Sequence, residues 1–175
     1  MYVRRKTRVA PQIVGGGQER MFRGGTENVP GIVGMGAACA AAQRDLDDTA
    51  RTVGALRDRF EAGVLRAFPA ARVNGQGAQR IHNTSNISFP SLQAEAILLM
   101  LSEAGICASS GAACSSGSLE PSHVLQAMGI EQRLAHGAVR FSFSRFNSID
   151  EVDRVVAELP ALLAPLTNLI AGQRS

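Results

Sequence analysis

Short strand patterns and helical patterns alternate in the second half of the chain, and this order constrains the fold more than any other sequence feature. Polar and apolar residues alternate over Asn86–Phe89 and again over Val139–Ser144, which is typical of half-buried strands. Apolar residues at helical spacing follow each of them, over Ala94–Ser102 and Ile149–Leu169. Strands that alternate with helices predict an α/β fold.

Shorter elements lie between these segments. Ile106–Ala108 is predicted to be a short strand and Pro121–Met128 a short helix. Proline removes a helical hydrogen-bond donor, so we expect Pro160 and Pro165 to interrupt or trim the final helix.

The first part of the chain is less regular. Tyr2–Arg5 has a strand-like pattern, and a long helical pattern begins at Pro30 and ends at Phe68. The polar segment Asp45–Thr49 predicts a bend or break in that helix. The glycine-rich turn Asn74–Gly77 predicts a hinge into a second unit.

Composition and charge exclude several classes of protein. The net charge of +3 comes from basic residues spread singly beside acidic ones, which is typical of solvated helix faces and disfavours nucleic-acid binding. No apolar run is long enough to span a membrane, and no signal peptide is visible. Three scattered cysteines favour a reducing compartment, so we expect a cytoplasmic protein. Only Lys6 among the 18 basic residues is a lysine.

The three cysteines have different surroundings. Cys114 lies in a segment of Ser, Gly and Ala in which no neighbour is large enough to bury it. An accessible thiol suits nucleophilic or redox chemistry. Cys39 and Cys107 have apolar neighbours, so both are predicted to pack in the core.

Two further features are candidates for ligand binding. Arg140 lies in the middle of the strand Val139–Ser144 and shares one face with two serines, while three apolar residues share the other. This setting suits bidentate binding of a carboxylate, and a pair with a surface acid is the alternative. The loop Arg23–Asn28 combines glycines, a hydroxyl and an arginine before a helix, which suits a phosphate; an ordinary turn is the alternative.

Three segments, in order, resemble the NifS/IscS class of cysteine desulfurases in the class-V aminotransferase family. Residues 109–123 resemble the segment that holds the catalytic cysteine of that class, and residues 136–145 resemble its substrate-arginine strand. Residues 17–28 resemble its cofactor-phosphate loop, and Thr26-Glu27-Asn28 is typical of the nitrogen-fixation branch. The resemblance runs from Tyr2 to about Leu169.

The resemblance implies a fold and a domain division. The expected fold is the C-terminal small domain of a fold-type-I enzyme dependent on pyridoxal 5'-phosphate, together with the last strand and the linking helices of the large domain. Residues 1–70 would end the large domain and carry those helices, and residues 71–175 would form the small domain.

The resemblance also implies a chemistry. Cys114 would remove sulfur from L-cysteine bound to pyridoxal phosphate, leaving L-alanine and a persulfide on Cys114. Arg140 would hold the substrate carboxylate, and Thr26 would bind the cofactor phosphate in the other subunit of a homodimer. An iron–sulfur scaffold protein, such as one that serves nitrogenase assembly, would accept the sulfur. Cys114 would then contact iron only transiently, through its persulfide.

The chain also departs from the family pattern. The Schiff-base lysine and acid–base histidine of the family lie upstream of the matching segment, and Lys6 does not replace that lysine. We therefore expect the isolated chain not to turn over cysteine. Ala112 replaces a residue that is more often serine in the family, and Gly24 replaces one that is more often serine or alanine. His123 and His136 match family positions and are expected to fix local structure.

Two other functions remain open from these residues. One is a stand-alone persulfide carrier that binds a scaffold protein, in which the Thr26 and Arg140 motifs would be idle. The other is a selenocysteine lyase or cysteine sulfinate desulfinase of the same fold.

Overall fold

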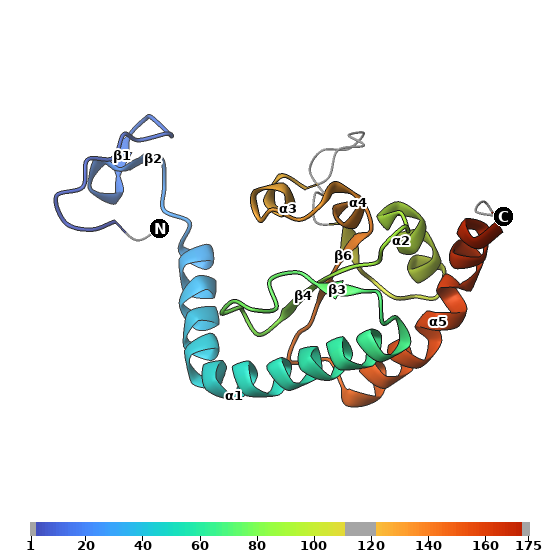
Figure 1. Ribbon diagram of the computed structural model, residues 1–175. Coiled ribbons are helices and arrows are strands. Elements are labelled where there is room, and N and C mark those ends of the chain that lie inside the picture. The colour runs from blue at the N-terminus through green and yellow to red at the C-terminus, as the bar shows by residue number, and fades with distance from the viewer. Residues whose placement is uncertain (1–2, 111–121, 173–175) are drawn as a thin grey trace. The chain divides into compact units, whose positions relative to one another are not determined.

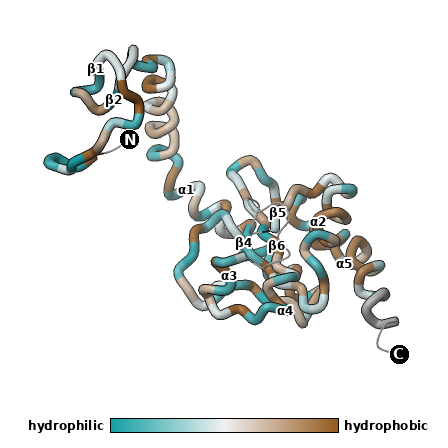
Figure 2. The backbone as a smooth tube through the Cα atoms, turned by 90° about the horizontal axis from the view of Figure 1, so that it is seen from above, coloured by the Kyte–Doolittle hydropathy of each residue, from teal (hydrophilic) through white to brown (hydrophobic). Residues whose placement is uncertain are grey.

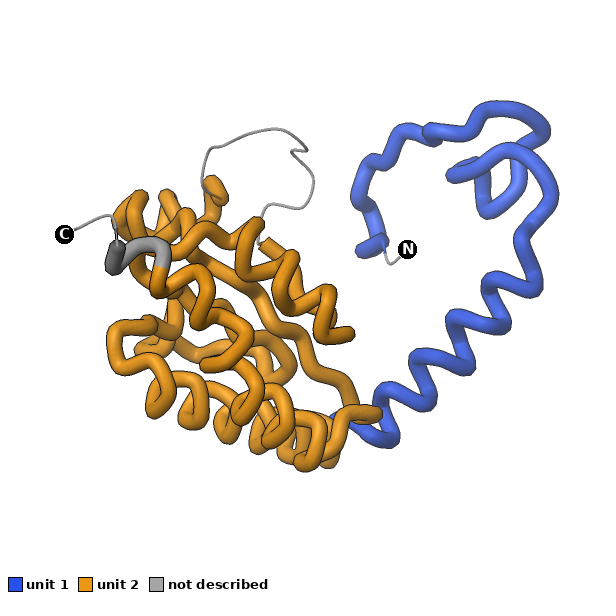
Figure 3. The backbone as a smooth tube through the Cα atoms, turned by 90° about the vertical axis from the view of Figure 1, so that its right-hand side faces the viewer, with its two compact units in different colours: residues 1–46 blue, residues 47–175 orange. Residues whose placement is uncertain are grey.

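The computed structural model describes residues 3–110 and 122–172, and the side chains of those residues up to 168. Two compact units divide the chain, Met1–Leu46 and Asp47–Ser175 (Figure 3). This division falls within the helix α1 (Val29–Ala67), whereas the family's own domain boundary near residue 70 stays a prediction.

Helix α1 does not break at its polar segment, so the predicted break does not occur, while a bend there stays a prediction. The segment keeps helical geometry because its polar groups bond along the helix. The Arg51 guanidinium pairs with the Asp48 carboxylate one turn away, and Thr52 Oγ1 donates to the Asp48 carbonyl at 2.8 Å. Asn28 caps the start of the helix, since its Oδ1 accepts a hydrogen bond from Gly31 N at 3.1 Å.

The first unit contains a small hairpin before α1. Strands β1 (Gly17–Gln18) and β2 (Arg23–Gly24) pair antiparallel, and the short 3-10 helix η1 (Glu19–Met21) connects them. The predicted strand at Tyr2–Arg5 is wrong for the described residues 3–5, which lead into a turn. No described strand lies beside this segment to accept its backbone hydrogen bonds.

The second unit is built around a four-stranded sheet of order β3-β4-β6-β5, in which all neighbours are antiparallel (Figure 1). Its strands are β3 (Arg72–Val73), β4 (Thr84–Ser88), β5 (Ser109–Ser110) and β6 (Ala138–Ser142). Its helices, besides the second half of α1, are α2 (Ala94–Glu103), α3 (His123–Ala127), α4 (Gln132–Ala135) and α5 (Ile149–Gly172). The predicted mixture of helices and strands is confirmed.

One face of the sheet packs on α1, α2 and α5 and forms the main core (Figure 1). The Phe60 ring of α1 packs on Phe141 of β6, with ring centroids 4.7 Å apart. Ile97 and Leu159, fully buried, contribute from α2 and α5, and hydrophobic positions recur along both helices (Figure 2). Burial of these side chains on one face stabilises the unit and determines which side of each strand faces outward.

Helix α5 runs through both prolines without interruption, so the predicted break is wrong. Pro160 and Pro165 lie on the exposed side of α5, where carbonyls that lose a helical donor can bind water. Leu159 and Leu163 are fully buried on its other side. This burial keeps the helix in place across the missing hydrogen bonds.

A capping box fixes the start of α5. Ser148 Oγ accepts from Glu151 N at 3.2 Å, and Glu151 Oε2 accepts from Ser148 N at 2.8 Å. The hydrogen bond from Ser148 N, with one from Asn147, lowers the pKa of Glu151. No helix in the part of the chain that the structure describes is long and apolar enough to cross a membrane.

Candidate active site

Arg140 lies on the face of the sheet opposite the main core. Val139 and Phe141, its neighbours along β6, are buried, whereas Arg140 and Ser142 are exposed. The alternation predicted from the sequence is therefore confirmed. We call this surface the Arg140 face; it comprises Arg72, Asn74, Thr84, Asn86, Ser88, Ser109, Ala138, Arg140 and Ser142.

Two short helices cover one end of the Arg140 face. Ala138 is buried against Leu125 of α3 and Ala135 of α4. Arg140, two residues further along β6, lies beyond that cover and is exposed. The side chain of Arg140 has no hydrogen-bond or ion-pair partner among residues 3–110 and 122–168. The alternative of a strand arginine neutralised by a surface acid therefore finds no support there.

The start of β6 is tightly fixed by glycine. Gly137 O accepts from Phe89 N at 2.9 Å, and His136 O accepts from Ala94 N at the same distance. A Cβ atom at Gly137 would lie 2.8 Å from the Leu92 carbonyl oxygen and closer still to that of Phe89. Only glycine allows this approach, which positions Arg140 three residues later. This contact is made by the His136 backbone, so the structural role expected of its side chain stays a prediction.

A polar network joins three neighbouring residues of the Arg140 face. Asn74 Nδ2 donates to Asn86 Oδ1 at 2.6 Å and to Ser88 Oγ at 2.8 Å. The turn after Asn74 leads to Arg80, whose guanidinium forms a double hydrogen bond with Glu61 of α1 at 2.7 and 3.0 Å. This hydrogen bond raises the pKa of Arg80. The network was not predicted, because it depends on which strands pair.

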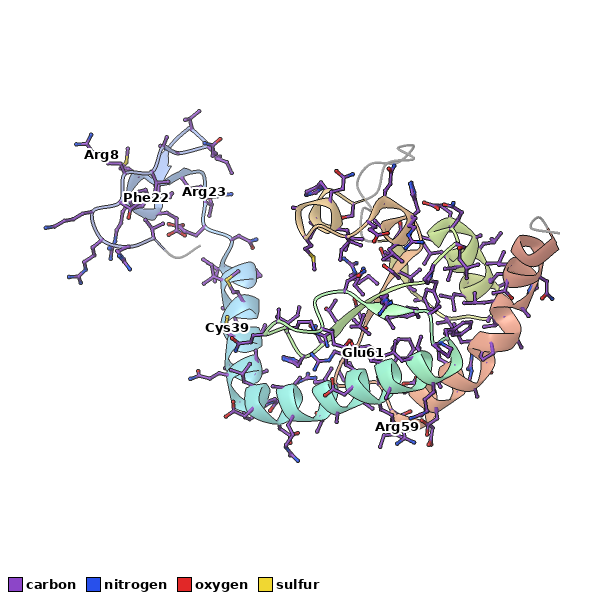
Figure 4. The ribbon with its side chains drawn as sticks, in the orientation of Figure 1. Arg8, Phe22, Arg23, Cys39, Arg59 and Glu61 are labelled. Carbon is purple, nitrogen blue, oxygen red and sulfur yellow. The ribbon has the colours of Figure 1, made fainter. Side chains whose placement is uncertain are left out.

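The predicted phosphate loop is organised by its own arginine. Arg23 Nη1 donates to the carbonyls of Gly24 and Thr26 at 3.0 and 3.1 Å (Figure 4). A Cβ atom at Gly24 would lie 2.7 Å from Gly15 N, so the serine or alanine common in the family would not fit this conformation. Thr26 is exposed, and no described residue accepts from its hydroxyl. The loop thus presents a free hydroxyl directly before the capped start of α1.

Lys6 and His123 lie outside any described cluster. Lys6 is exposed in a turn with φ +69°, closed by a hydrogen bond from Thr7 N to Arg4 O. That Lys6 replaces no catalytic lysine stays a prediction. His123 is exposed as the first residue of α3.

Cys114 lies outside the described residues, and so does Ala112. The other two cysteines are exposed free thiols, so the prediction that they pack in the core is wrong. Cys39 lies in the part of α1 that belongs to the first unit, where residues 31–40 are all exposed (Figure 4). Cys107 precedes β5, which begins at Ser109 rather than at Ile106 as predicted. Ile106 and Ala108 pack inward on either side of Cys107, which leaves its thiol facing outward.

An open groove of about 320 Å³ lies beside Cys107. Its walls include Phe60, Phe141 and Phe143, so it lies mainly on the core side of β6, and Ser142 also lines it. The charged and amide side chains of its lining have partners: Asn147 donates to Glu151, and Arg154 donates to Glu158 and to the Ala104 carbonyl.

The described residues contain no group of three or more His, Cys, Asp or Glu side chains that could hold a metal ion. The predicted transient contact of Cys114 with iron lies outside them. Among the described residues, the candidate group for a cofactor is the Thr26 hydroxyl, and the candidate group for a substrate is the Arg140 guanidinium.

The chain is similar to proteins named cysteine desulfurase. A "Cysteine desulfurase" of Gluconacetobacter diazotrophicus is 52% identical over 169 residues, which cover 97% of this chain and 42% of that protein. "Cysteine desulfurase NifS" of Azotobacter vinelandii is 50% identical over 169 residues, again 42% of its length. The chain thus spans about two fifths of these relatives.

Solved structures show the same fold. A protein titled "NIFS-LIKE PROTEIN" matches with a TM-score of 0.81 and 34% identity, over 93% of this chain and 41% of that one. The NifS-like protein from Rickettsia africae matches with a TM-score of 0.79 and 29% identity, over 90% of this chain and 41% of that one. The predicted fold, part of a larger NifS-like enzyme, is confirmed. The family model for "Aminotransferase class-V" matches residues 6–155, so the chain belongs to the class-V aminotransferase family.

Proposed function

We propose that this chain contributes to the active site of a cysteine desulfurase, which removes sulfur from L-cysteine and releases L-alanine. One observation carries the proposal: Arg140 is exposed on a polar face without an acid partner among the described residues, in a chain about 50% identical to proteins named cysteine desulfurase. We assign this desulfurase activity to the native gene product that contains these 175 residues, and the activity and binding experiments below use that protein.

Arg140 is proposed to bind the α-carboxylate of L-cysteine. A guanidinium presents paired donors that match the two oxygens of a carboxylate, and such charge-assisted pairs are strong and directional. Two features of the described structure support the role. The tight packing of Gly137 fixes the strand, and the cover of α3 and α4 ends before Arg140.

Cys114 is proposed to be the nucleophile. Its thiolate would attack the sulfur of the bound L-cysteine, so that a sulfur–sulfur bond forms and the carbon–sulfur bond breaks. The electron pair of the broken bond stays on the substrate carbon, which takes a proton and becomes the methyl group of alanine. Cys114 follows Ser110 by four residues, so the chain keeps their Cα atoms within about 14 Å. Ser109, next to Ser110, pairs directly with Arg140.

Thr26 is proposed to contact the phosphate of pyridoxal 5'-phosphate, the cofactor on which the family depends. The free hydroxyl of Thr26, on a loop whose carbonyls are held by Arg23, fits an acceptor-rich group such as a phosphate. When bound, the cofactor supplies an electron sink for the substrate carbon atoms. We propose that the contact is made to the other subunit of a homodimer, as the family resemblance implies.

The sulfur on Cys114 is proposed to pass to a scaffold protein for iron–sulfur cluster assembly, in the cytoplasm. The relative named NifS and the Thr26-Glu27-Asn28 sequence support a role in nitrogen fixation. Iron would be met only as cargo of the scaffold.

The proposal is tested by the kinetics of alanine release from L-cysteine. The purified native gene product, supplied with pyridoxal phosphate, should release alanine and sulfide in the presence of a thiol reductant. Arg140→Ala should raise KM for L-cysteine by about tenfold or more, because a charged hydrogen bond is lost. Cys114→Ser should abolish turnover, and Cys107→Ser should not change it. A stand-alone sulfur carrier would instead release no alanine and would be indifferent to Arg140→Ala.

A further inference from the structure

A row of polar side chains crosses three strands at Arg140. Asn86 of β4 is the register partner of Arg140 on one side, and Ser109 of β5 is its partner on the other. Residues directly opposite each other in antiparallel strands point to the same face, with Cβ atoms about 4.5–5.5 Å apart. The Arg140 side chain therefore lies between the Asn86 amide and the Ser109 hydroxyl.

Asn86 is held in one orientation by the network beside it. Its Oδ1 accepts the hydrogen bond from Asn74 Nδ2 at 2.6 Å, and the other hydrogen of that amide is directed to Ser88 Oγ. Asn74 is 8% exposed and Ser88 is fully buried, so an unmade hydrogen bond there would be costly. With its oxygen fixed on Asn74, Asn86 directs its Nδ2 group away from the network.

The result is a pair of donor groups without acceptors. Within the residues that the structure describes, nothing accepts from Asn86 Nδ2, and nothing accepts from the Arg140 guanidinium. Ser109 Oγ donates to the Ser110 carbonyl at 3.0 Å, and it accepts from neither of these two groups. An ionised carboxylate only accepts hydrogen bonds, and it has sites for several donors.

We propose that Asn86 is a second substrate-binding residue, which donates from Nδ2 to the same carboxylate that Arg140 binds. The inference rests on the proposed function. It adds that Arg140 and Asn86 together select substrates that have a free carboxylate. Asn74 is then a positioning residue, since it acts only through the orientation of Asn86.

Two substitutions of Asn86 separate this role from a structural one. Asn86→Ala removes the donor and also the acceptor used by Asn74. Asn86→Asp is isosteric and keeps that acceptor, but it replaces the outward donor by a charged oxygen beside the ligand. Thr84→Val is the matched control. Thr84 lies on the same face two residues before Asn86, and among the described residues its hydroxyl donates to Asn83 alone.

The readout is the dissociation constant for L-alanine, which does not react, measured by NMR titration of the native gene product. L-Alaninamide, which lacks the carboxylate, is the chemical control. We expect Asn86→Ala to weaken L-alanine binding by about tenfold, as for one hydrogen bond to a charged group. Asn86→Asp should weaken it further, Thr84→Val should leave it unchanged, and none of the variants should change the response to L-alaninamide.

The outcomes separate this inference from the proposed function. Loss of binding in Arg140→Ala with no loss in Asn86→Ala overturns the inference alone. An Asn86→Asp protein that binds as well as Asn86→Ala, or better, also overturns it. If the wild type releases no alanine from L-cysteine, the proposed function fails. The inference is then decided by L-alanine binding, where equal behaviour of wild type and Asn86→Ala overturns it.

Discussion

The crossing of α1 and α5 depends on a glycine, and replacing it gives a quantitative test of the packing. A Cβ atom at Gly63 would lie 2.6 Å from Val156 Cγ1 and 2.8 Å from Val156 Cγ2. Both distances are far below van der Waals contact, so Gly63→Ala must displace one helix or the valine. Overpacking of this kind costs about 1–3 kcal/mol, and alanine in a helix interior recovers about 1 kcal/mol. We expect a net loss of about 1 kcal/mol in the free energy of unfolding.

The second substitution of the cycle removes the clashing atoms. Val156→Ala deletes two partly buried methyl groups, and we expect it to cost about 1 kcal/mol, less than the full transfer value. In the double variant the clash is gone, and the remaining Cβ–Cβ distance of 3.2 Å requires only a small adjustment. The double variant should therefore be close to wild type, with a coupling energy of about 2 kcal/mol.

Urea unfolding of the purified chain, followed by far-UV circular dichroism, measures all four proteins of this cycle. The urea midpoints of two proteins are compared only where the slope of the unfolding free energy against urea concentration is the same, because only then does a change of midpoint report a change of stability. Gly54→Ala is the matched control in the same helix, because its Cβ would meet His82 Cβ at an ordinary 3.7 Å. It should stabilise the chain by about 1 kcal/mol. The reasoning is refuted if Gly63→Ala stabilises as much as Gly54→Ala, or if the two substitutions of the cycle are additive.

Three further perturbations test other contacts of the second unit. Glu61→Leu should destabilise by about 2 kcal/mol in urea unfolding, because it leaves the half-buried Arg80 guanidinium without its acceptor; an unchanged midpoint would contradict this. Ser85→Ala should raise stability by about 1 kcal/mol, since Ser85 Oγ is buried with no hydrogen-bond partner, and a loss would show a missed partner. Glu151→Gln should lower the melting temperature well above pH 4.5, the ordinary pKa of the group, because the capping hydrogen bonds lower its folded pKa. The difference should shrink as the pH falls through that lowered pKa, and a constant difference down to low pH would contradict the capping role.

Local patterns predicted much of the second unit. The alternation around Arg140 was predicted because a period of two requires no knowledge of the neighbouring strands. Gly105 and Gly129 end their helices with φ of +73° and +72°, as expected for glycine stops. The capping box at Ser148 and Glu151 was missed, although its Ser-x-x-Glu spacing is visible in the sequence.

Features that depend on tertiary pairing could not be predicted in the same way. The row of Asn86, Arg140 and Ser109 depends on the register between strands far apart in the sequence. Cys39 and Cys107 were misplaced because apolar neighbours show only that a segment meets a core. Which side of the segment faces that core is decided by packing partners, and residues 31–40 have none that bury them within their own unit.

The proposed chemistry makes one residue the carrier of sulfur, and mass spectrometry tests this most directly. The native gene product, supplied with pyridoxal phosphate and L-cysteine and alkylated without reductant, is digested, and the peptides that hold Cys39, Cys107 and Cys114 are compared. The account predicts that the Cys114 peptide gains the mass of one sulfur atom while alanine appears, and that Cys114→Ser abolishes both. Extra sulfur on the Cys39 or Cys107 peptide instead, or alanine release that survives Cys114→Ser, would contradict it.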